Sequence, residues 1–154
     1  QAKAAGQDVT ALEADLTEIE IAEYRKRIDR QPTEMGNRFA LAQRLYRKGD
    51  IDAAAAEFQQ SVKDPRFRKK SHSYLGHAFA KKNLLDLARD QFTSCLSLID
   101  DHLSDEYKEA LYNRGRINEV LGRKEDAATD FTKVVEIDLS YKDAAERIRK
   151  LRGG

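Results

Sequence analysis

The residues whose chemistry suits catalysis or metal binding are few, namely three histidines and one cysteine in 154 residues. His72 and His77 are five residues apart, so on a helix they point to different sides and do not match the i, i+4 histidine pair of a helical zinc site. His102 has no cysteine or carboxylate at the usual ligand spacing. Cys95 has no second cysteine with which to form a disulfide or a metal-binding CxxC pair, and we interpret it as a packing residue. The sequence also lacks a Gly-x-Ser-x-Gly turn and a phosphate-binding glycine loop. We therefore predict no catalytic residue, no metal site and no cofactor, and interpret the protein as not an enzyme.

Charge is nearly balanced over the whole chain, with 28 lysines and arginines against 27 acidic residues, but it is unevenly distributed. Residues 8–23 contain six acids and no base, whereas residues 66–82 contain six lysines and arginines and no acid. The basic stretch lacks the interleaved aromatic residues of a single-strand nucleic-acid platform. We predict a protein or peptide partner, with an acidic peptide as the best match, and no nucleic acid.

The sequence bears on the cellular location of the protein through its hydrophobic runs, its ends and its single cysteine. No apolar run approaches the ~20 residues that a membrane span needs, and no cleavable signal precedes the first expected helix. The chain begins at Gln1 and ends at Gly153-Gly154, which we interpret as a segment cut from a longer protein. With one cysteine indicating a reducing compartment, we expect a cytoplasmic protein without a membrane span in this segment.

An internal sequence repeat indicates which secondary-structure elements the chain forms. Tyr24, Phe58 and Phe92 recur at steps of 34 residues, and a third copy places Phe131 a further 39 residues on. The same steps relate Gly49, Asn83 and Gly122, the alanines Ala54, Ala88 and Ala127, and the small residues Ala42, Gly76 and Gly115. A period in this range indicates stacked supersecondary units. The five extra residues fall within 99–104, before Ser104, which is a good helix N-cap.

Each copy divides into two apolar-periodic stretches joined by a tight break: 38–48 and 52–63, 71–82 and 86–99, and 106–121 and 124–137. These patterns predict antiparallel helical hairpins. Gly49, Asn83 and Gly122 stand where a first helix would end in a left-handed residue. The small residues in the middle of the first helices would allow close approach of the second helices.

The combination of a small residue in the first helix, the turn Gly49-Asp50, then Ala54, and Phe58 four residues later, resembles the tetratricopeptide repeat (TPR). The resemblance extends over about residues 20 to 151. It implies an all-α fold, a right-handed α-solenoid of antiparallel helical hairpins. Arg38, His72 and Leu111 depart from the family pattern, which has a large aromatic residue at their position.

The resemblance implies the following organisation: a flexible N-terminal segment 1–9, a long N-terminal capping helix 10–31 that forms half a repeat, repeat 1 at 34–65, repeat 2 at 68–100, repeat 3 at 104–139 after the insertion, and a C-terminal capping helix 141–152. Thr10 and Glu13 would form a capping box at the start of the first of these helices.

Two features leave alternatives open. Val9, Leu12, Leu16 and Ile19 follow a 3-4-3 spacing, which indicates either the end of a coiled coil or simply a cover for the first hairpin. Arg114 and Asn118 replace apolar residues of the other copies. They either reach solvent or pair locally, or they contact a polar partner.

In TPR folds the first helices line the concave wall, and the resemblance therefore implies a partner-binding groove formed by Phe39, Gln43, Tyr46, Arg47, Lys70, Ser73, Tyr74, His77, Lys81, Tyr112, Asn113, Arg116 and Glu119. Aromatic and basic side chains of this kind are enriched at interaction surfaces. Chaperone-binding members of the family grip a C-terminal carboxylate with lysines and asparagines, but the matching residues here are Phe39, Gln43, Tyr74, Glu109 and Asn113. This clamp is not reproduced, which disfavours the acidic tails of heat-shock chaperones as ligands.

We thus expect a non-catalytic protein–protein interaction module that binds a peptide or helix of a partner in its concave groove, as one domain of a larger scaffold or assembly protein of bacterial type. Two alternatives remain: an element for homo-oligomerisation, and a domain that recruits substrate for a catalytic domain outside this segment.

Overall fold

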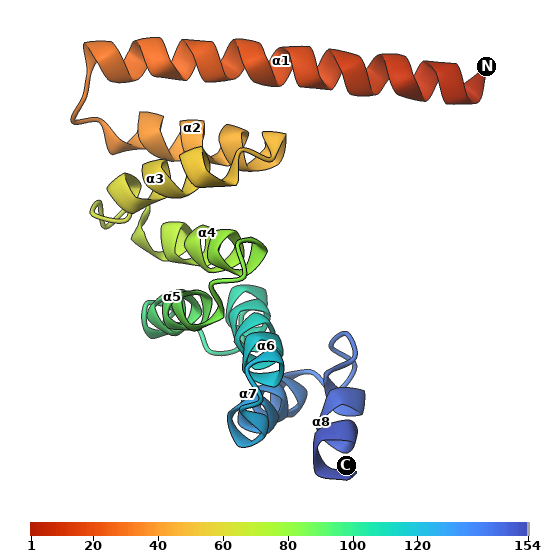
Figure 1. Cartoon of the computed structure of the whole chain (residues 1–154). Coiled ribbons are helices and arrows are strands. Elements are labelled where there is room, and N and C mark those ends of the chain that lie inside the picture. The colour runs from red at the N-terminus through yellow and green to blue at the C-terminus, as the bar shows by residue number, and fades with distance from the viewer. Residues whose placement is uncertain (154) are drawn as a thin grey trace. The chain divides into compact units, whose positions relative to one another are not determined.

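The computed structural model describes residues 1–153, which form eight helices and, within that range, no strand (Figure 1). The helices are α1 (Ala2–Arg30), α2 (Met35–Lys48), α3 (Ile51–Ser61), α4 (Arg68–Lys81), α5 (Leu85–Ser97), α6 (Asp105–Val120), α7 (Lys124–Ile137) and α8 (Ala144–Gly153). The predicted all-α fold is therefore confirmed. The chain divides into two compact units at the bond between Ser71 and His72, within α4. No helix in the described range is both long and apolar enough to cross a membrane.

The first unit contains α1, α2 and α3. The C-terminal half of α1 packs on α2 through buried Ile21 and through Tyr24, whose ring lies 5.0 Å from the Arg44 guanidinium. Ion pairs between Glu20 and Arg44 (2.6 Å) and between Glu18 and Lys48 (2.5 Å) link the same two helices. Figure 1 shows that α1 continues past the end of α2, so its N-terminal half has no helix of this unit beneath it.

The predicted beginning of α1 is wrong. The helix starts at Ala2, so the segment predicted as residues 1–9 forms its first turns. The Thr10 hydroxyl donates to the carbonyl of Gly6 (2.9 Å), a bond made inside a helix, and therefore does not cap one. Ala2, Ala4 and Ala5 strongly favour the helical conformation. A capping box marks the start of a helix only where the residues before it are not helical.

The turns between paired helices have the predicted chemistry. Gly49, Asn83 and Gly122 all adopt positive φ angles, of 95°, 59° and 76°. The Asp50 side chain accepts from the Ala53 amide at the start of α3, and Ser104 accepts from the Tyr107 amide at the start of α6. The predicted left-handed ends and the Ser104 N-cap are thus confirmed.

In both units, each hairpin closes on one buried phenylalanine of its second helix. Phe58, Phe92 and Phe131 are at most 1% exposed. A Cβ atom added to Gly76 would lie 2.8 Å from the Phe92 ring, and one added to Gly115 would lie 2.8 Å from the Phe131 ring. The small residues predicted from the repeat are therefore needed because the ring occupies the space of a side chain.

The second unit runs from His72 through α8. Its core includes Cys95, which is 1% exposed as its predicted packing role requires, together with Leu111, Phe131 and Val134. α8 buries Ala144 and packs Ile148 and Leu151 against this core. Arg149 and Lys150 of α8 are exposed, which gives the helix the polar outer side expected at the end of a repeat array.

Candidate functional site

A hollow of about 220 Å³ in the second unit brings together residues of α4 and α6 that the sequence assigned to a binding groove. It is lined by His77, Ala80, Phe92, Asn113, Arg116, Ile117 and Val120. We call His77, Asn113 and Arg116 the α4–α6 site. They are three of the thirteen predicted groove residues. His77 lies on α4, the first helix of the second hairpin, and Asn113 and Arg116 lie on α6, the first helix of the third.

His77 is the central residue of the α4–α6 site. Its ring stands edge-on to the Phe92 ring, with the centroids 5.1 Å apart, and Asn113 Nδ2 donates to His77 Nε2 across 3.4 Å. Burial lowers the pKa of His77; the charge of Glu109 opposes this shift, and those of Lys81 and Lys142 add to it. The imidazole is therefore neutral at pH 7, and accepting the bond from Asn113 requires its proton on Nδ1.

Arg116 supplies the charge of the α4–α6 site. Its side chain is exposed, and it forms no ion pair or hydrogen bond with residues 1–153. Lys81 is exposed one turn beyond His77 on α4, and Val120, 70% exposed, lies at the margin of the hollow. A free guanidinium beside an amide and an apolar surface can hold a carboxylate together with a small apolar side chain.

The other predicted residues of the second unit do not line this hollow. Ser73 and Tyr74 are partly buried on α4. The Tyr112 hydroxyl donates to Asp143, and Tyr112 is only 6% exposed. Glu119 forms an ion pair of 2.6 Å with Arg147 of α8. Contacts with Asp143 and Arg147 thus hold Tyr112 and Glu119, whereas His77, Asn113 and Arg116 line the hollow.

In the first unit the predicted residues differ in exposure. Phe39 is 8% exposed and stacks on Phe67 with centroids 5.1 Å apart, so it is a core residue in this structure. Gln43 and Tyr46 are partly buried, whereas Arg47 and Lys70 are exposed. Arg47 lies beside a separate hollow of about 400 Å³ between α1 and α2, whose remaining lining residues are Thr10, Glu13, Ala14, Asp15, Thr17, Glu18 and Lys48.

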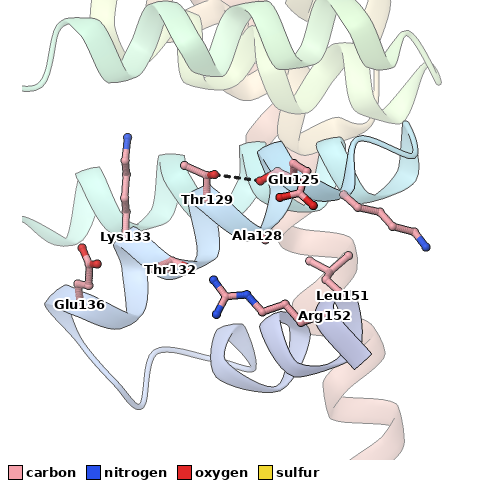
Figure 2. A pocket seen from close by; sticks show the side chains of 9 residues that line it. Glu125, Ala128, Thr129, Thr132, Lys133, Glu136, Leu151 and Arg152 are labelled. Atoms are coloured by element: carbon pink, nitrogen blue, oxygen red, sulfur yellow. Dashed lines mark hydrogen bonds between the residues drawn. The ribbon is translucent and has the colours of Figure 1, made fainter. Parts of the chain in front are cut away.

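A larger hollow, of about 510 Å³, lies between α7 and α8 (Figure 2). Figure 2 shows Glu125, Lys133 and Glu136 on α7, with the Arg152 side chain in the space between the two helices. None of the predicted groove residues lines this hollow. Because acidic and basic side chains alternate around it, the hollow presents no consistent charge to a ligand.

The structure also reveals a set of polar bridges between the two helices of each hairpin. Arg38 donates to Glu57 (3.1 Å), His72 pairs with Gln91 (2.7 Å), and Arg114 binds both carboxylate oxygens of Asp130 (2.7 and 3.0 Å). Glu57, Gln91 and Asp130 occupy equivalent positions, separated by the 34- and 39-residue steps. These bridges were not predicted from the sequence, although the repeat register alone aligns the three acceptor positions.

Asp130 explains the polar residues Arg114 and Asn118. Asp130 is 2% exposed and Asn118 3% exposed, and Asn118 Nδ2 donates to Asp130 Oδ2 (3.2 Å). The hydrogen bonds that Arg114 donates to Asp130 raise the pKa of Arg114, so the guanidinium stays charged. Of the two alternatives for these residues, local pairing is therefore correct, and the pairing partner is a buried carboxylate on α7.

Comparison with known proteins supports the repeat assignment. Two models described as tetratricopeptide repeat match residues 39–94 and 108–141, which together are more than half of the chain. The chain belongs to the tetratricopeptide repeat family. No curated protein sequence matches this TPR chain.

Solved TPR structures share its fold. A crystal structure of MamA superposes with a TM-score of 0.79 at 18% identity, covering 95% of this chain and 78% of MamA. YrrB, described as a TPR protein with an unusual peptide-binding site, gives 0.78 at 17% identity over 92% of this chain and 70% of its own. The first TPR of Spaghetti (RPAP3), solved with the HSP90 peptide SRMEEVD, gives 0.67 at 16% identity over 78% and 91%. At these identities the likeness establishes the helical-repeat solenoid fold.

Proposed function

We propose that this chain is a non-catalytic protein–protein interaction module and that its α4–α6 site binds an acidic peptide or helix segment of a partner protein. The observation that supports this function best is the hollow in which His77, Asn113 and Arg116 meet beside exposed Lys81. Two structural neighbours are described with a bound peptide or a peptide-binding site, which agrees with this use of the fold.

The chemistry of the site favours a short acidic motif. Arg116 can pair with a carboxylate through two parallel hydrogen bonds, and Asn113 can present its amide oxygen to a backbone N–H of the ligand. Val120 and Ile117 offer apolar contact for one neighbouring side chain of the peptide. Cations at the margin of such a surface would also increase the rate of encounter with an acidic partner.

The proposed ligand differs from the C-terminal tail of a heat-shock chaperone. Of the five residues that match the family's carboxylate clamp, Phe39 is buried in the core, and only Asn113 lies in the α4–α6 site. We therefore propose an internal acidic segment of a partner, within a larger scaffold or assembly protein in the cytoplasm.

The proposal can be tested by selecting peptides from a random 12-residue display library on the immobilised protein. We expect the enriched peptides to be acidic and to bind Arg116→Glu at least about tenfold more weakly, which corresponds to ~1.4 kcal/mol. Lys133→Glu on α7 is a matched control because it makes the same charge change on an exposed side chain of the same unit. Both variants should keep the circular dichroism of the wild type.

Two results would contradict the proposal. Enriched peptides without acidic residues would show that the charge of Arg116 is not used. Equal weakening by Arg116→Glu and Lys133→Glu would show a response to net charge rather than to the α4–α6 site.

A further inference from the structure

The N-terminal half of α1 carries an apolar stripe that nothing in the first unit covers. Val9, Leu12, Leu16 and Ile19 are 55%, 59%, 49% and 65% exposed. Large aliphatic side chains in a contiguous row are not an ordinary surface, because each leaves apolar area in water. The alternative in which these residues cover the first hairpin is therefore wrong.

The stripe is uncovered because of its position around the helix axis. Thr17 and Ile21, the buried residues of α1, mark the face that packs on α2, and Tyr24 lies on the same face against Arg44. At about 100° per residue, the centre of the stripe lies about 130° away from this face. No adjustment of α2 could bury both sets of side chains.

The stripe has the spacing of a two-stranded coiled-coil seam. Val9, Leu12, Leu16 and Ile19 occupy alternate a and d positions, and Ala2 and Ala5 continue the 3-4 pattern toward the N-terminus. The seam from Ala2 to Ile19 covers 18 residues, or about 27 Å of helix. Such a seam is completed by a second helix with apolar residues at the same spacing.

The charges beside the seam indicate the character of that second helix. Asp8 and Asp15 occupy g positions and Glu13 an e position, and none of the three forms an ion pair with residues 1–153. Glu20, at the next e position, pairs with Arg44. Two copies of α1 would therefore bring acidic residues against acidic residues along both sides of the seam, and like charges at these positions oppose pairing.

We propose that the N-terminal half of α1 binds a basic amphipathic helix of a partner protein, forming a two-stranded coiled coil. The apolar residues of the partner pack on Val9, Leu12, Leu16 and Ile19, and its lysines or arginines lie against Asp8, Glu13 and Asp15. This surface shares no residue with the α4–α6 site, and its ligand has the opposite charge. An anionic membrane is disfavoured as the occupant because the acids beside the seam would be repelled by it.

The experiment uses the whole chain and a labelled 21-residue helical peptide with isoleucine and leucine at a and d and lysine at e and g. A second peptide, identical except for glutamate at e and g, is the control ligand. Fluorescence anisotropy should show the lysine peptide binding at least about tenfold more tightly than the glutamate peptide, and this preference should shrink as salt is raised.

Variants of the chain test the seam itself. Leu12→Gln/Leu16→Gln should weaken binding of the lysine peptide at least about tenfold, because the residues at the centre of the seam would no longer be apolar. Ala4→Gln/Ala11→Gln is a matched control, since both alanines are exposed on α1 away from the seam. Neither pair should lower the urea midpoint, because none of the four side chains is buried.

Three outcomes would overturn the proposal. Equal affinity for the two peptides would show that Asp8, Glu13 and Asp15 do not contribute to binding. Binding that survives Leu12→Gln/Leu16→Gln would place the peptide elsewhere. A dimer of the chain alone in sedimentation velocity, abolished by Leu12→Gln/Leu16→Gln, would identify a second copy as the occupant of the stripe.

Discussion

At the scale of single residues, the ends of the first helices depend on backbone conformation. Gly122 adopts a φ of 76°, and nothing lies within 4 Å of the place that a Cβ atom would take. A substitution there meets no steric obstacle outside its own backbone, so its cost reflects the left-handed conformation alone.

We expect Gly122→Ala to lower the free energy of unfolding by about 1–2 kcal/mol, the cost of the left-handed conformation for a residue with a Cβ atom. Urea denaturation followed by circular dichroism measures this loss. Gly6→Ala is the matched control, because Gly6 is also open to solvent but lies inside right-handed α1. A loss of similar size at Gly6 would contradict the conformational explanation.

At the scale of helices, the third hairpin is held by a buried ion pair where the other two have apolar contacts. Leu41 and Leu75 occupy the position of Arg114, and both are buried. The polar bridges of the first two hairpins are made one turn earlier on the first helix, by Arg38 and His72. The polar bridge of the third hairpin therefore lies deeper in the core. The buried Asp130 carboxylate depends on Arg114 and Asn118 for its hydrogen bonds.

We expect Arg114→Leu to lower the free energy of unfolding by about 3–5 kcal/mol, because it leaves the Asp130 carboxylate buried without a cation. Adding Asp130→Asn should recover part of that loss, since the neutral amide can still accept from Asn118. Urea unfolding of the single and double variants measures both effects. A double variant no more stable than Arg114→Leu would show that lost packing, rather than an unpaired charge, causes the loss.

At the scale of the whole molecule, stability and exposed surface are unevenly divided along the chain. The buried residues of α1 begin at Thr17, so residues 1–12 add helix without adding core. The first unit should therefore fold without them, and an exposed helix with an apolar stripe agrees with a role in binding.

We expect deletion of residues 1–12 to change the free energy of unfolding by no more than about 0.5 kcal/mol, the usual effect of a change outside the core. The helical circular dichroism should fall in proportion to the residues removed, while the urea midpoint stays constant. A clear drop in the midpoint would show that the N-terminal half of α1 contacts the folded protein.

The sequence by itself determined the features that repeat or that are local. The 34- and 39-residue steps located the three hairpins and their buried phenylalanines, because every copy must solve the same packing problem with the same residue types. Left-handed ends at Gly49, Asn83 and Gly122 followed from local backbone preference. The seam of α1 was visible as a spacing, and three residues of the α4–α6 site were named from the repeat register.

Only the tertiary structure decided which residues pair across the hairpins and which remain exposed. Asp130 meets Arg114 from another helix, and Asp143 reaches Tyr112 from 31 residues away, so neither contact follows from a local pattern. Tyr112 is held by its contact with Asp143 and Glu119 by an ion pair with Arg147, and core packing buries Phe39. The exposure of the α1 stripe also follows from tertiary packing. Side chains on opposite sides of α1 cannot both face α2, so the way in which α1 packs on α2 determines which set is buried.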